Sequence, residues 1–207
     1  MLRLLRCKIC YAEAECKMTI YTFPNEKPTS QSIELMTNSR TFQSPITNAT
    51  QTLSRKGSYW KMRMTFSNIT GDKRGVLQGF FAKLNGKEHR ARIADYGYVK
   101  RGTASGTASI NGAGQTGSTV TISGLSGSLK AGDYISFSNE LHMVTADVAG
   151  SGAVPISPPI RKPTTNLATV DVSSPVGVFM LEGGPSWSTS GLNVSNMTVN
   201  LIEDVLA

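Results

Sequence analysis

The residues best suited to metal chemistry are three cysteines near the start of the chain, Cys7, Cys10 and Cys16. Thiolates at Cys-x-x-Cys spacing bind zinc or an iron–sulfur cluster when a fourth ligand completes the site. No fourth ligand stands nearby, and the nearest histidine is His89. We therefore predict no metal site, with these three cysteines as the candidates if one forms.

Acid–base chemistry would depend on two histidines, His89 and His142, or on scattered carboxylates. His89 follows a charged stretch and is expected in solvent, whereas His142 is expected at the surface or half-buried in a strand. Four carboxylates lie in turns or at strand ends, where they usually cap the backbone or are solvated: Asp133, Glu140, Asp147 and Asp171. No nucleophile signature accompanies them. We predict no catalytic residues and no enzyme activity.

A literal G-x-G-x-x-G occurs at Gly112, Gly114 and Gly117. A dinucleotide site needs a helix after this motif, so that the phosphate meets the helix N-terminus. A polar strand pattern follows here instead, so we predict a turn and no cofactor.

Four aromatic side chains could stack on sugars or bases: Trp60, Trp187, Tyr96 and Tyr98. They are not interleaved with a basic stripe, so the pattern does not favour nucleic-acid readout. We expect Trp60 to pack in the core and Trp187 to anchor a loop.

Composition indicates a β-rich protein. Only 17% of the 207 residues are charged, and the net charge is +7. Abundant Ser, Thr, Asn and Gly favour strands and turns over helices. No stretch reaches the ~18 apolar residues of a transmembrane helix, so we predict no membrane insertion and synthesis in the cytoplasm. The basic residues are dispersed, and we expect each small group to be solvated: Lys73-Arg74, Lys87 with Arg90 and Arg92, Lys100-Arg101, and Arg161-Lys162.

Periodicity predicts the elements. Strands are expected near 32–36 and over 90–98, and a polar turn over 38–45. Trp60 to Phe66 alternates apolar with polar residues, which predicts a half-buried strand with a basic outer face. A single amphipathic helix is predicted between Asp72 and Leu84, with its apolar stripe formed by Val76, Leu77, Phe80, Phe81 and Leu84.

Composition shifts divide the chain. Residues 1–17 are interpreted as an N-terminal leader, because Met18 opens a more ordinary start. Small flexible residues after Arg101 and the segment 161–165 mark two boundaries. A main domain is therefore expected over 18–103 and 165–207, with a small β domain inserted over 104–164. The final strands of the main domain are expected around Val170 and Val172, then 176–180 and 197–201.

Several segments together resemble one family. They include 38–45, 51–60, Asn85-Gly86, 117–120, 129–135, 144–147 and 154–161. From about Met18 onward, this series is similar to the distal tail proteins found at the tail tip of long-tailed (siphovirus-like) bacteriophages. The similarity lies in structural residues, and it offers no catalytic residues to carry over.

The resemblance implies a mainly β fold. A discontinuous β-barrel or sandwich belt domain with one helix would carry an inserted galectin-like or OB-like β domain. The belt would close into a homohexameric ring in the virion, joining the tail tube protein to the tail-tip or baseplate hub protein, with DNA passing only through the lumen. Such a lumen is commonly acidic while this chain is basic, so we expect the basic residues at interfaces with acidic neighbours.

Two rival functions stay open. The inserted β domain could bind a carbohydrate or receptor as a module of the same tail tip. A cell-surface hydrolase is a third possibility, although no nucleophile, base or metal cluster is readable from the sequence.

Overall fold

The computed structural model describes residues 18–55, 57–190 and 194–205. The leader with Cys7, Cys10 and Cys16 lies outside the described residues. Among those described, the structure is mainly β and has a single helix. The predicted fold class, a β-barrel or sandwich with one helix, is confirmed.

The main sheet is curled into a half-barrel. β1 pairs with β6 in parallel, and the other neighbours are antiparallel. The strands follow the order β1 (Ile20–Thr22), β6 (Arg90–Ile93), β15 (Gly177–Leu181), β17 (Ser195–Glu203), β5 (Tyr59–Ile69) and β2 (Ser30–Met36), with β16 (Ser186–Thr189) also paired to β17.

Strand β5 shows why this sheet has one buried face. Trp60, Met62, Met64 and Phe66 are buried, while Lys61 and Arg63 between them are not, as the alternation predicted. Because successive strand side chains point to opposite faces, one face of β5 forms core and the other is polar.

Helix α1 (Gly71–Lys83) covers part of the core face. Leu77, Phe81 and Leu84 are buried against the sheet, and Phe80 packs partly against it. Val76 is 49% exposed, so its place in the predicted apolar stripe was wrong. The rest of the stripe is confirmed.

The second sheet forms a nearly closed barrel beside the main sheet. Its strands follow the order β10 (Tyr134–Phe137), β11 (Glu140–Val144), β13 (Gly152–Ile160), β8 (Gly117–Ser123), β7 (Ala108–Ile110) and β14 (Thr169–Val170). A two-stranded ladder of β9 (Ser128–Leu129) and β12 (Val148–Ala149) accompanies it.

The barrel segment leaves the main sheet after β6 and rejoins it at β15. The barrel has its own core, and that core includes Val170 and Val172. We expected these two valines in the final strands of the main domain. They lie in the barrel because β14 pairs with β7 and extends the second sheet beyond residue 164.

Two local predictions also need correction. Residues 38–45 are not simply a turn, because Ser39–Gln43 form strand β3. The strand expected over 90–98 ends at Ile93, and Tyr96 and Tyr98 follow it outside regular structure.

Candidate functional site

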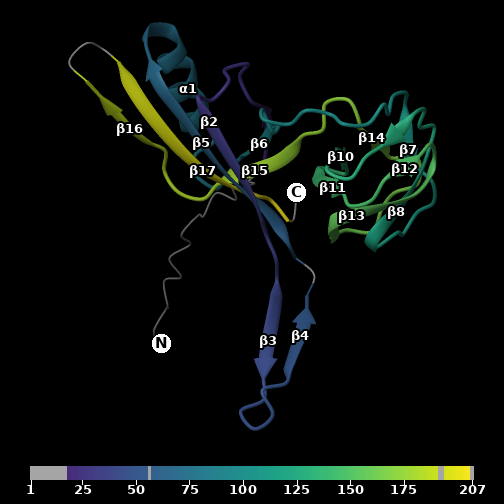
Figure 1. Ribbon diagram of the computed structural model, residues 1–207. Helices are drawn as coiled ribbons and strands as arrows, with labels where there is room; N and C mark the ends of the chain where they lie inside the picture. The colour runs from purple at the N-terminus through teal and green to yellow at the C-terminus, as the bar shows by residue number, and fades with distance from the viewer. Residues whose placement is uncertain (1–17, 56, 191–193, 206–207) are drawn as a thin grey trace, which may run out of the picture.

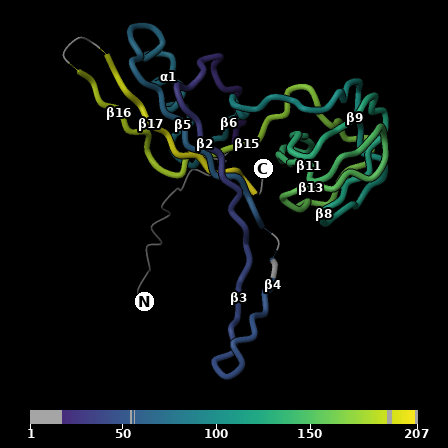
Figure 2. The backbone as a smooth tube through the Cα atoms, in the orientation of Figure 1, coloured from purple at the N-terminus to yellow at the C-terminus, as the bar shows by residue number. Residues whose placement is uncertain are grey.

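A two-stranded arm projects from the main sheet (Figures 1 and 2). It consists of β3 and β4 (Thr50–Ser54), which pair antiparallel from Ser39↔Ser54 to Gln43↔Thr50. Figure 2 shows it reaching away from the main sheet beyond β2 and β5. Among the described residues, no further strand pairs with either arm strand. Both outer edges therefore offer unpaired backbone groups.

One face of the arm exposes two apolar side chains beside Arg40 and Gln51. Phe42 pairs with Gln51 and Leu53 pairs with Arg40, so Phe42 and Leu53 are diagonal neighbours on one face. Phe42 is 57% exposed and Leu53 is 48% exposed. Ile46, in the loop that joins the strands, is 93% exposed. The opposite face carries small polar side chains, including Thr41 paired with Thr52.

Such an arm is an unusual structure for a free surface. An isolated two-stranded ribbon is marginally stable in water, because it cannot bury its apolar residues. A long exposed edge with apolar side chains is also a template for pairing with another chain. The arm therefore has the form of an association surface.

The boundary between the two sheets is closed by aromatic side chains. Tyr134 and Leu141 come from the second sheet but pack in the core of the main sheet. The rings of Trp60 and Tyr134 pack edge to face, with their centroids 5.8 Å apart. The indole N–H of Trp60 donates a hydrogen bond to the Leu141 carbonyl oxygen at 2.8 Å. The rings of Tyr98 and Tyr134 also pack edge to face, with their centroids 5.1 Å apart. Burial raises the pKa of Tyr98 and of Tyr134 to about 12.

A buried ion pair lies at the same boundary. Arg161 follows β13 of the second sheet, and Glu203 ends β17 of the main sheet. The guanidinium donates from Nη1 to Oε2 at 2.7 Å and from Nη2 to Oε1 at 2.8 Å. Glu203 also accepts the backbone N–H groups of Trp60 at 3.1 Å and Leu141 at 3.0 Å. The bonds from Arg161 and Leu141 therefore fix the second sheet against the main sheet, while the bond from Trp60 holds Glu203 in place within the main sheet.

A second buried carboxylate and a histidine extend this ion pair. Glu140 accepts the backbone N–H groups of Arg161 and Lys162, both at 3.2 Å. Nε2 of His142 lies 3.3 Å from Oε2 of Glu140, without hydrogen-bond geometry. Nδ1 of His142 lies 2.8 Å from the Pro158 carbonyl oxygen, and its ring stacks on Phe137.

The charges at this boundary stabilise one another. Burial opposes ionisation of Glu140, but the contact with His142 and the charge of Arg161 outweigh it and lower the pKa of Glu140. Burial likewise opposes the charge of Arg161, but the hydrogen bonds and charge of Glu203 raise its pKa. We call Arg161, Glu203, Glu140 and His142 the junction cluster.

Asp133 ties the segment between the sheets to the barrel. Its carboxylate is fully buried and accepts the backbone N–H groups of Arg101 at 2.7 Å, Gly102 at 2.9 Å and Lys130 at 2.8 Å. The Tyr98 hydroxyl donates to it at 3.3 Å. Burial opposes ionisation of Asp133, but the three backbone donors outweigh it and lower the pKa of this group.

The structure revises several expectations about the chemistry-bearing residues. His142 is fully buried, not at the surface, because it packs between β10 and β13. His89 is partly buried against Tyr21. Trp60 is a core residue, as predicted, whereas Trp187 lies in strand β16 and is 46% exposed.

The glycine motif forms a turn, as predicted. Gly112, Gly114 and Gly117 all have positive φ, and strand β8 follows them. In the described part of the chain, no three His, Cys, Asp or Glu side chains gather into a metal site. No helix among the described residues is long and apolar enough to span a membrane.

Sequence reasoning missed two groups of residues. Arg161 was expected in solvent, but its side chain is 5% exposed, because Glu203 and Glu140 neutralise it from distant strands. The arm was missed because its Thr- and Ser-rich strands resemble a turn. The alternation around Phe42 and Leu53, on either side of a turn containing Pro45, was a signal that could have revealed it.

Comparison with known proteins does not assign this chain. No protein-family model matches it, and no curated protein matches it.

Proposed function

We propose that this chain is a structural virion protein, a ring-forming distal tail adaptor that joins a bacteriophage tail tube to the tail-tip hub. The resemblance of its sequence segments to that family motivates the proposal. The observation that carries it is the projecting arm, which exposes Phe42, Leu53 and Ile46 together with unpaired strand edges. A subunit of a ring needs such a surface, since neighbours bury what the free chain leaves open.

The charge of the arm fits this role. No carboxylate side chain occurs between Glu34 and Asp72, whereas Arg40 lies within β3 and Arg55 directly follows β4. A basic arm favours acidic neighbours in the assembly. Tail tube and hub proteins with acidic surfaces are the partners that the proposal requires.

The rigid boundary between the sheets also supports an adaptor. A connector must keep its parts in fixed relative positions while it is held between other rings. The junction cluster and the Trp60–Leu141 hydrogen bond provide such a constraint without any ligand.

Native mass measured over a concentration series tests the proposal. The wild-type chain should form a closed oligomer of about six copies. The double variant Phe42→Ser/Leu53→Ser should stay monomeric at the same concentrations, with an unchanged circular dichroism spectrum. The matched control is Thr41→Ser/Thr52→Ser, which alters the polar face of the same arm and should assemble like the wild type.

Two outcomes would oppose the proposal. One is a wild-type chain that stays monomeric at every concentration and also fails to bind isolated phage tail tubes. The other is an oligomer that the Phe42→Ser/Leu53→Ser variant forms equally well, because assembly would then not use the arm.

A further inference from the structure

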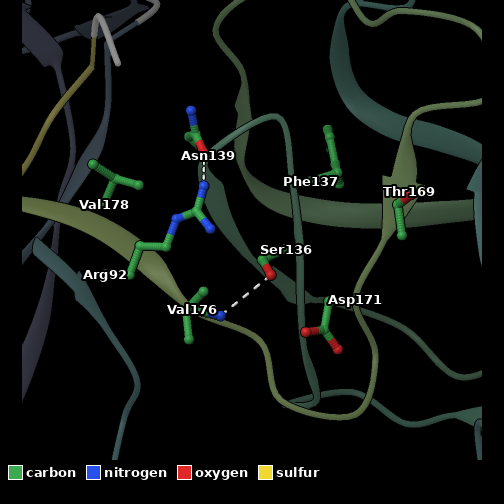
Figure 3. A pocket seen from close by; sticks show the side chains of 8 residues that line it. All are labelled: Arg92, Ser136, Phe137, Asn139, Thr169, Asp171, Val176 and Val178. Atoms are coloured by element: carbon green, nitrogen blue, oxygen red, sulfur yellow. Dashed lines mark hydrogen bonds between the residues drawn. The ribbon is translucent and has the colours of Figure 1, made fainter. Parts of the chain in front are cut away.

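A small pocket lies between the two sheets (Figure 3), and its lining includes no arm residue, although its Phe137 stacks on His142 of the junction cluster. Its volume is about 290 Å³, close to the lower end of the range for small-molecule sites. Ligand sites also occur preferentially where two folded units meet. The lining comes from β6 and β15 of the main sheet and from β10, β14 and adjoining turns of the barrel: Arg92, Ser136, Phe137, Asn139, Thr169, Asp171, Val176 and Val178.

One wall presents a cation without a carboxylate partner. Among the described residues, Arg92 forms no ion pair, and its Nη2 donates a 3.5 Å hydrogen bond to the Asn139 side-chain oxygen. Arg90, two residues earlier in the same strand, pairs with Asp204 at 2.5 Å. The guanidinium of Arg92 is thus available, and its planar fork matches a carboxylate.

The opposite wall presents groups suited to hydroxyls. One oxygen of Asp171 accepts the backbone N–H groups of Ser173 and Ser174 at 2.8 and 2.9 Å. No hydrogen bond from a described residue reaches its other oxygen. The Ser136 hydroxyl accepts the Val176 N–H at 3.2 Å, which leaves its own proton free to donate. In Figure 3, Asp171 lies on the far side of the pocket from Arg92, and Ser136 lies between the two.

The rest of the lining is apolar. Phe137, Val176 and Val178 contribute to the pocket, while Arg92 and Thr169 are exposed at its rim. A ligand can therefore enter from solvent and place an apolar face against the valines. The pocket combines one cation, one carboxylate, several neutral hydrogen-bonding groups and an apolar strip.

We infer that this pocket binds a sugar acid, a monosaccharide unit that carries a carboxylate, as at the end of an acidic polysaccharide. Arg92 binds the carboxylate, Asp171 and Ser136 bind ring hydroxyls, and the valines contact the apolar face of the ring. A phosphate carries about −1.5 to −2 charge, so Asp171 repels it more strongly than it repels a single carboxylate, and a neutral sugar leaves the Arg92 cation without a partner. The inference does not depend on ring assembly.

Titration of the isotopically labelled full chain with D-glucuronate and D-galacturonate, followed by NMR, tests this inference. At least one of the two should bind saturably in the millimolar range and shift the amide signals of Ser136, Asn139 and Asp171. Glucose and acetate serve as matched probes, because glucose has the ring hydroxyls without the carboxylate and acetate has the carboxylate without the ring. Both should bind at least about tenfold more weakly.

Two variants assign the binding to the pocket. Arg92→Gln removes the cation, and Asp171→Asn keeps an oxygen for the Ser173 and Ser174 amides while removing the charge. Arg92→Gln should weaken sugar-acid binding about tenfold or more, because a charged hydrogen bond is lost. Asp171→Asn should weaken it by a smaller factor. Arg63→Gln, an exposed arginine on β5 outside this pocket, is the control and should bind like the wild type.

Other results would overturn the inference. If neither sugar acid binds in the millimolar range, the pocket is not a sugar-acid site. If acetate binds as tightly as the sugar acids, the pocket recognises only an anion. If Arg92→Gln binds the sugar acid as tightly as the wild type, the sugar acid binds at another place on the protein. Amino acids that bind where sugar acids do not would replace the proposed ligand with a zwitterion.

Discussion

Arg161 and Glu203 form a bidentate ion pair across the boundary between the sheets, with N···O distances of 2.7 and 2.8 Å. The side chain of Glu203 is fully buried. Such a pair does not necessarily stabilise the fold relative to apolar residues, but removing one partner leaves an uncompensated buried charge. The loss of either side chain should therefore weaken the junction between the barrel and the main sheet.

Arg161→Ala should be strongly destabilising. It leaves Glu203 buried without its cation, and we expect the free energy of unfolding to fall by about 3–5 kcal/mol. Urea denaturation followed by tryptophan fluorescence measures this change, because Trp60 lies at the boundary. Lys61→Ala breaks the exposed pair with Glu182 and is the control, with no resolved change expected. Equal urea midpoints for Arg161→Ala and the wild type would contradict a structural role for the pair.

Asp133→Ala should loosen the connection between the sheets. Three buried backbone N–H groups would lose their acceptor, and each unsatisfied donor costs about 1–3 kcal/mol. We expect a total loss of about 3 kcal/mol or more in the free energy of unfolding, measured by urea denaturation. Asp147→Ala removes an exposed carboxylate of the same barrel and should have a clearly smaller effect. If both variants unfold at the same urea concentration, the Asp133 contacts contribute little.

A pair of glycines separates backbone strain from steric clash. Gly127 and Gly150 both have positive φ, so alanine at either position adopts an unfavourable backbone conformation. A Cβ at Gly127 would also collide with the Thr103 carbonyl oxygen, whereas a Cβ at Gly150 would meet nothing within 4 Å. Gly127→Ala should therefore lower the melting temperature more than Gly150→Ala, as calorimetry can measure. The reverse order would show that the close approach of Thr103 is not rigid.

Stability should fall in acid. The pKa values of Asp133 and Glu140 are lowered in the folded state, so the unfolded chain binds more protons once the pH approaches the ordinary carboxylate range. Their contribution is complete above about pH 4 to 5 and is lost as the pH falls through the lowered folded values. Urea midpoints measured from neutral to acidic pH should show this loss, and Asp133→Asn should reduce the slope. A midpoint that stays constant below pH ~4 would contradict this assignment.

Local patterns were sufficient to predict much of the fold. The alternation of Trp60 and Met62 with Lys61 predicted β5, since period two is a property of any half-buried strand. Leu77 and Phe81, at helical spacing, likewise predicted α1. Both patterns are fixed by neighbours in the sequence, which is why the sequence was informative about them.

The buried charges could not be predicted in this way. Glu203 is 42 residues from Arg161 and 143 residues from Trp60 in the sequence. No local sequence pattern can therefore predict either contact. The arm was missed for a different reason, because its Thr- and Ser-rich strands resemble a turn and only Phe42 and Leu53 mark their alternation. The pocket depends on Arg92 and Asp171 lying on different sheets, a proximity that no local segment encodes.

The position of β17 within the main sheet has a consequence for biosynthesis. β17 lies between β15 and β5, yet it follows all the barrel strands along the chain. The barrel is formed from one continuous stretch of chain, so it can fold while the ribosome is still translating the rest. The half-barrel must wait for β17, which supplies Met197, Val199, Leu201 and the Arg161 partner Glu203. Until then Trp60 and Met62 of the nascent chain lack their permanent cover, so the vulnerable period for aggregation is the interval before β17 emerges.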